Sequence, residues 1–114
     1  MALAGNNRTK SAAVTAQNMF TSWVRIDSRQ SANPFTASLI DDSTTLSVTW
    51  TVQARRILTT TMGDTKGNII DLYTSPALSN GGVQTAQLAG VWEIRVGVKT
   101  GNYTAGTGVA AIDW

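Results

Sequence analysis

The chain of 114 residues contains no cysteine and no histidine. Without cysteine there can be no disulfide, so packing or assembly must stabilise the fold. Without histidine the chain lacks the commonest general base and a common metal ligand, which excludes triads built on Cys or His and ordinary zinc sites. We therefore expect no catalytic residue, no metal site and no cofactor. The protein is expected to act by binding and not as an enzyme.

Charge is also scarce, because charged residues make up 14% of the chain against about 25% in an average soluble domain. The net charge is +2, and the basic residues are scattered singly apart from the pair Arg55 and Arg56. A nucleic-acid surface requires clustered Lys and Arg, and a membrane span requires about 20 apolar residues. The sequence has neither feature. It therefore predicts no nucleic-acid partner and no membrane partner.

From Phe20 onward, short segments rich in β-branched and aromatic residues alternate with turn signals that contain Gly, Asn, Asp or Pro. Strands at a regular spacing of about 8–12 residues are typical of antiparallel sandwiches and jelly rolls. We predict an all-β fold, an antiparallel β-sandwich of jelly-roll type, over residues 19–114. Residues 1–18 show no clear period and are predicted to form an extended N-terminal arm, with a disordered terminus as the alternative. The predicted strands are 20–26, 35–40, 46–54, 69–73, 83–88, 90–99 and 108–114.

Two of these strands alternate strictly between apolar and other residues, over Leu46–Ala54 and over Trp92–Val98. A period of two predicts a strand with one buried face. In the first strand the outward side chains are expected to meet solvent or a polar protein contact; they are Ser47, Thr49, Thr51 and Gln53. In the last strand, 108–114, the pattern leaves open which of the two faces is buried.

The four tryptophans lie at positions 23, 50, 92 and 114. Trp50 and Trp92 are in phase with aliphatic residues of their own strands, so we interpret them as core residues. The alternative is a platform on which sugar rings stack. Trp114 is expected either to close the core or to contact a neighbouring protein.

The consecutive residues Arg55 and Arg56 must point to opposite faces of a strand. Arginine is enriched at interfaces, which favours an ion pair with a partner, and a strand end where both side chains reach solvent is the alternative. The segment Asp64–Asn68 has spaced oxygen ligands but lacks the full set of a calcium loop, so we interpret it as a turn. The candidate partner-binding residues are Arg8, Lys10, Arg55, Arg56 and Trp114.

The segment from Val48 to the end resembles small virion proteins of tailed bacteriophages. The resemblance lies in the alternating strand Val48–Gln53 and in the strand that begins at Gly90 and leads into the hairpin Lys99-Thr-Gly-Asn-Tyr-Thr-Ala-Gly-Thr107. In those proteins a Trp- or Tyr-led strand also runs into a Gly-rich hairpin, and a last strand follows. The relatives usually carry an Asp-Gly-Gly-x-x-Trp turn in the middle, where this chain has Gly63-Asp-Thr-Lys-Gly-Asn68.

This resemblance implies a β-sandwich on the exterior of a phage capsid, made in the bacterial cytoplasm. The implied function is a decoration, or cement, protein that binds and stabilises the shell of major capsid protein. A homotrimer or another cyclic oligomer is expected with it, because ring closure covers sheet edges. The alternatives are a tail, adaptor or fibre component of the virion, and a glycan-binding β-sandwich module.

Overall fold

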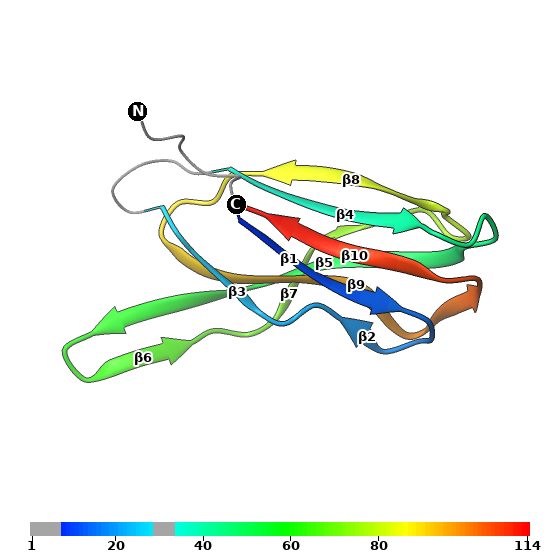
Figure 1. Cartoon of the computed structure of the whole chain (residues 1–114). Coiled ribbons are helices and arrows are strands. Elements are labelled where there is room, and N and C mark those ends of the chain that lie inside the picture. The colour runs from blue at the N-terminus through cyan, green and yellow to red at the C-terminus, as the bar shows by residue number, and fades with distance from the viewer. Residues whose placement is uncertain (1–7, 29–33) are drawn as a thin grey trace, which may run out of the picture.

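The computed structural model describes residues 8–28 and 34–114 and contains strands but no helix among them (Figure 1). The described residues form ten strands, against seven predicted, because one segment predicted as arm and one predicted as a turn are strands, and the predicted strand 20–26 is divided into two. The strands are β1 (Thr9–Val14), β2 (Met19–Phe20), β3 (Val24–Asp27), β4 (Phe35–Asp41), β5 (Ser47–Thr60), β6 (Gly63–Lys66), β7 (Ile70–Thr74), β8 (Gly81–Ala86), β9 (Val91–Ala105) and β10 (Gly108–Asp113).

The strands form two antiparallel sheets. The first sheet has the order β1-β10-β4-β8, and the second has the order β2-β9-β5-β6, with β3 also paired to β9 and β7 also paired to β5. Successive segments of the chain pass from one sheet to the other, as Figure 1 shows for β4, β5, β8, β9 and β10. The prediction of an all-β antiparallel fold is confirmed.

The inward side chains of both sheets form one hydrophobic cluster. The inward phase predicted for β5 and β9 is confirmed for the buried side chains of Val48, Trp50, Val52, Ala54, Ile94, Val96 and Val98. Trp92, predicted as a core residue, is only partly buried and packs against this core. The sequence left open which face of the last strand is buried, and in the structure the side chains of Ala110 and Ile112 lie in this core. The first sheet contributes Val14, Phe35, Ala37, Leu39, Ala110 and Ile112, and the second contributes Val24, Ile26, Val48, Trp50, Val52, Ala54, Ile94, Val96 and Val98.

The N-terminal arm predicted for residues 1–18 is not confirmed. Residues 9–14 form β1, which pairs along its whole length with β10, and Val14 is fully buried. This strand was not predicted because its small side chains give no clear period. Its position depends on backbone hydrogen bonds to β10, whose residues are about 100 positions away in the sequence. Residues 1–7 of the predicted arm lie outside the described residues.

Two outward residues of β5 that were expected to meet solvent or a polar protein contact are buried. Thr51 is fully buried and Gln53 is 7% exposed. Gln53 lies between two charged neighbours, donating to Asp71 and accepting from Arg95. The outer face of this sheet is therefore covered by its own long side chains, which a pattern read along one strand does not reveal.

Candidate functional site

The outer faces of the two sheets differ in charge. In an antiparallel ladder, residues that oppose each other share a face, so the pairing registers identify both outer faces. The charged face, on the second sheet, carries Arg25, Arg55, Lys66, Arg95, Lys99, Asp27, Asp64, Asp71 and Glu93. The neutral face, on the first sheet, consists of Thr9, Ser11, Ala13, Thr36, Ser38, Ile40, Gly81, Val83, Thr85, Val109, Ala111 and Asp113.

Aromatic rings order the arginines of the charged face. The guanidinium carbon of Arg95 lies 4.2 Å from the ring centroid of Phe20 and 4.6 Å from that of Trp23. The guanidinium of Arg55 lies 4.2 Å from the same Trp23 ring. Such contacts contribute about 0.5–1 kcal/mol each where they are exposed. The Trp23 ring thus contacts two guanidinium groups of its own chain.

Polar contacts extend this arrangement across three strands. Arg55 forms an ion pair with Glu93 at 2.7 Å, and Lys99 forms one with Asp71 at 2.8 Å. The hydrogen bond from Lys99 holds the pKa of the Asp71 carboxyl below its usual value, and a second hydrogen bond from Gln53 acts in the same direction. Burial, and secondarily the nearby Arg55 guanidinium, lower the pKa of Arg95. Most charged side chains of this face are therefore paired with an opposite charge of the same chain.

The predicted partner-binding residues fall into two groups. Arg8 and Trp114 lie together, joined by two backbone hydrogen bonds of 3.0 Å and by a guanidinium 5.7 Å from the indole ring. Lys10 lies two residues after Arg8, on β1 opposite Ile112, and is exposed. These three residues lie on β1 and β10, or immediately beside them, in the first sheet, whereas Arg55 and Arg56 lie on β5 in the second.

Arg55 and Arg56 point to opposite faces, as predicted from the strand geometry. Arg55 belongs to the charged face and pairs with Glu93 of its own chain, so the ion pair assigned to a partner is intramolecular. Arg56 opposes Trp92 at the end of the inner face, with its guanidinium 6.0 Å from that ring, and is exposed.

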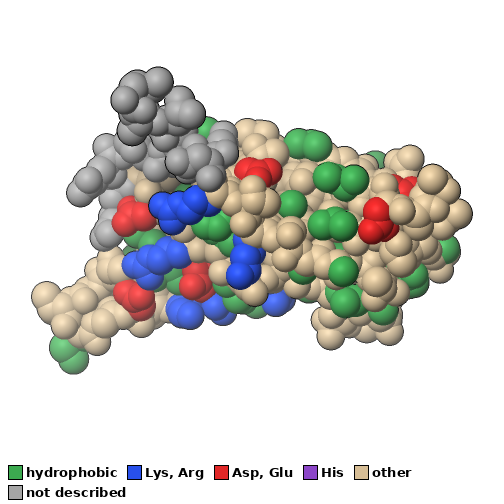
Figure 2. Space-filling view, viewed as in Figure 1, with side chains coloured by type: hydrophobic (Ala, Val, Ile, Leu, Met, Phe, Trp, Pro, Cys, Tyr) green, Lys and Arg blue, Asp and Glu red, His purple; other side chains and the backbone are tan. Residues whose placement is uncertain are grey.

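The neutral face is formed by small and apolar side chains. Its one charged member, Asp113, accepts a hydrogen bond from the hydroxyl of Thr9. Two large apolar side chains stand out from it, Val83 at 62% and Ile40 at 58% exposure. Figure 2 shows Lys and Arg side chains gathered toward the left of the molecule, with acidic side chains both among them and farther to the right, where hydrophobic and neutral side chains cover most of the visible surface.

A small crevice opens between the edge strands of the two sheets. It encloses about 90 Å³. Its walls come from β4, β5, β7 and β8, and none of its lining residues is charged. The lining residues are Phe35, Val52, Leu72, Tyr73, Gln84, Thr85 and Ala86. Tyr73 is fixed there by its contact with Trp50, whose ring centroid lies 5.1 Å away. This space is called the edge crevice below.

Sequence reasoning missed Phe20 and Arg95 as members of the charged face, and it did not relate Trp23 to the two arginines. One available signal was the placement of Arg95 at an out-of-phase position of the alternating strand Trp92–Val98. The partner strands are not visible in the sequence, since β2 and β3 reach β9 from about 70 residues away.

No family model, curated protein or solved structure matches this chain. Within residues 8–28 and 34–114, no helix is long and apolar enough to cross a membrane. The same residues contain no group of three Asp or Glu side chains placed to hold a metal ion.

Proposed function

We propose that this protein is a structural component of a bacteriophage virion, a decoration protein that binds the outside of the major capsid protein shell. The observation that carries the proposal is the neutral face, a four-stranded surface whose single charged side chain is paired internally. The cores of protein interfaces are depleted in charge and are formed by apolar side chains. The resemblance of the segment from Val48 to the end of the chain to phage virion proteins supports the same function.

The size of the neutral face favours attachment through many copies. Four strands about 4.8 Å apart, each about six residues long at about 3.4 Å per residue, give a footprint of roughly 400 Å². A standard interface buries about 800 Å² on each partner. One copy would therefore bind weakly through this face alone, and a cyclic oligomer such as a trimer would multiply that affinity on a repetitive shell. We include such self-association in the proposal.

The proposed fold within the two-sheet class is a jelly-roll sandwich. The strand order supports this fold. If β2 and β3 are counted together as the second strand, and β6 and β7 together as the fifth, the chain has eight strands in sequence. The first sheet then has the order 1-8-3-6, and the second sheet has the order 2-7-4-5. Two interleaved Greek keys of eight strands produce this order, and viral capsid domains use it widely.

The tryptophans argue against the glycan-binding alternative. Trp50 is 1% exposed, and Trp23 already has two guanidinium groups beside its ring. Stacking of a sugar needs an open aromatic face, so these two rings would have to move first. A tail, adaptor or fibre role uses the same kind of protein contact and is separated from decoration by the experiment below.

Co-sedimentation with empty capsids that lack this protein tests the proposal. Wild-type protein should sediment with the capsids, and Ile40→Lys and Val83→Lys should each weaken that binding at least about tenfold, because each would bury a charge against the partner. Ile69→Lys is the matched control, since Ile69 is also half-exposed but lies outside the neutral face. A wild-type protein that fails to sediment with capsids would refute decoration, and binding to purified tails in its place would support the alternative.

A further inference from the structure

The hairpin formed by residues 58–66 projects beyond the second sheet. The pairing of β5 with β9 ends at Ile57, and past that residue β5 pairs only with β6. Figure 1 shows this hairpin leaving the body at one end, and Figure 2 shows hydrophobic surface at its tip. The turn residue Met62 is 94% exposed, and Leu58 on the same hairpin is 51% exposed.

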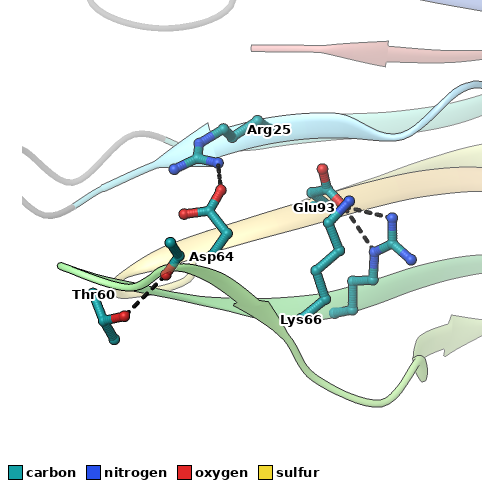
Figure 3. A network of polar contacts seen from close by, with 7 residues as sticks. Arg25, Thr60, Asp64, Lys66 and Glu93 are labelled. Carbon is teal, nitrogen blue, oxygen red and sulfur yellow. Dashed lines mark hydrogen bonds and ion pairs between the residues drawn. The ribbon is translucent and has the colours of Figure 1, made fainter.

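The hairpin is held in a defined position although it projects. Asp64 forms an ion pair with Arg25 of β3 at 3.0 Å, and Lys66 approaches Glu93 of β9 at 3.6 Å (Figure 3). At the tip, the Thr60 hydroxyl donates to the Gly63 carbonyl and accepts from the Met62 amide. An isolated two-stranded hairpin is marginal in water. These contacts preorganise the hairpin, which lowers the entropy lost when its tip enters a partner.

The edge crevice has properties that match this tip. It is apolar, it lacks charged lining residues, and its volume of about 90 Å³ is several times what one water molecule requires. The tip from Leu58 to Gly63 is likewise uncharged. A methionine side chain is unbranched and flexible, so it adapts to a narrow apolar space.

The tip cannot reach the crevice of its own chain. Val52, which lines the crevice, and Thr60, at the base of the turn, both lie on the extended strand β5. Eight residues of strand separate them, which is about 27 Å. A hairpin tip that occupies this crevice must therefore belong to another molecule.

We propose that Met62 of one copy inserts into the edge crevice of a second copy. Two different surfaces meet in this contact, so it is head-to-tail and produces a ring where the rotation closes. A single insertion buries less than a stable interface of about 1,000 Å² needs, so the contact is weak between two free molecules. It specifies the self-association included in the proposed function but does not require capsid binding.

Because the chain has no cysteine, paired cysteine variants test this contact without background. Met62→Cys and Ala86→Cys, purified separately, are mixed at millimolar concentration and oxidised. The matched control replaces Ala86→Cys by Ala77→Cys, an exposed alanine that does not line the crevice. We expect the disulfide between positions 62 and 86 to form at least ten times faster than that between 62 and 77. Equal rates, or faster coupling of Met62→Cys with itself, would overturn the proposal.

Sedimentation equilibrium provides a second measurement with intact side-chain packing. Met62 is on the surface, so Met62→Asp should leave the fold unchanged and weaken self-association at least about tenfold. Leu78→Asp, at an exposed apolar residue elsewhere, should leave the association unchanged. Association that is insensitive to Met62→Asp would overturn the proposal. Capsids are absent from both experiments, so their outcome is independent of the test of decoration.

Discussion

Replacing Gly97 by alanine tests the close approach of β2 to β9. A Cβ atom at this position would lie 2.1 Å from the carbonyl oxygen of Met19 and 2.6 Å from the Cα of Phe20. Non-bonded carbon atoms prefer about 3.5–4.0 Å, so β2 must move away by about 1 Å or more. That movement would break the contacts that hold the polypeptide between Met19 and Thr21 against the sheet.

The cost can be worked out from these contacts. Thr21 exchanges two hydrogen bonds with Val96, at 2.9 and 3.2 Å, and each contributes about 0.5–1.5 kcal/mol. The Phe20–Arg95 contact adds about 0.5–1 kcal/mol. The lower backbone entropy of alanine in the unfolded chain offsets up to about 1 kcal/mol. The net loss in free energy of unfolding is about 2 kcal/mol, which lowers the melting temperature by about 8 °C for a domain of this size.

Thermal unfolding followed by circular dichroism measures this loss. Gly67→Ala is the matched control, because its new Cβ would come no closer than 3.4 Å to any residue beyond its chain neighbours, the distance to the Arg56 carbonyl oxygen, which is ordinary van der Waals contact. We expect the control to change the free energy of unfolding by less than about 0.5 kcal/mol. If Gly97→Ala melts within about 2 °C of the wild type, the reasoning about β2 is refuted.

Two further predictions concern the core and the turn after β4. Trp50→Ala should destabilise the fold by about 3–5 kcal/mol in chemical denaturation, because the ring is buried in the hydrophobic core; a folded variant that only lost glycan binding on an array would show instead that Trp50 is a ligand residue. Asp41 accepts hydrogen bonds from Ser43 and Leu46, and the backbone bond from Ser43 is the main reason that its pKa lies below 3.8. A carboxyl whose pKa is lower in the folded state stabilises the fold above its unfolded pKa of about 3.9, and this contribution is lost as the pH falls through the folded pKa. Asp41→Asn should therefore be less stable than wild type at pH 7, with the difference shrinking below about pH 4; a difference that is constant with pH would contradict this role.

The sequence allowed prediction of those features that depend on one strand at a time. Alternation in Leu46–Ala54 indicated which side chains enter the core, and the structure confirms Val48, Trp50, Val52 and Ala54. The pattern left solvent or a polar protein contact open for Thr51 and Gln53; both are buried, and the polar partners of Gln53 lie on neighbouring strands. A periodic pattern reports the two faces of a strand and carries no information about what lies above each face.

The candidate surfaces were harder to predict for the same reason. The prediction that Arg55 and Arg56 point to opposite faces is confirmed. The ion-pair partner of Arg55, Glu93, lies on a different strand, and only the pairing register of the two strands brings Arg55 and Glu93 together. Gly63–Lys66 was interpreted as a turn, whereas it forms β6 with the end of β5. The segment contains Gly and Asp, which favour turns, and the hairpin uses them close to its tip.

The position of β10 between β1 and β4 constrains the order in which the fold can form. Until residues 108–113 have been synthesised, β1 has no neighbour in the first sheet and β4 has only β8. A nascent chain can pair β5 with β6 and β7, and β4 with β8, before β10 exists, but β1 stays unpaired and one edge of β4 stays open until then. Sheets that depend on such distant pairing fold slowly and expose strand edges while they wait. Deletion of these last residues should therefore produce aggregation and not a smaller folded protein.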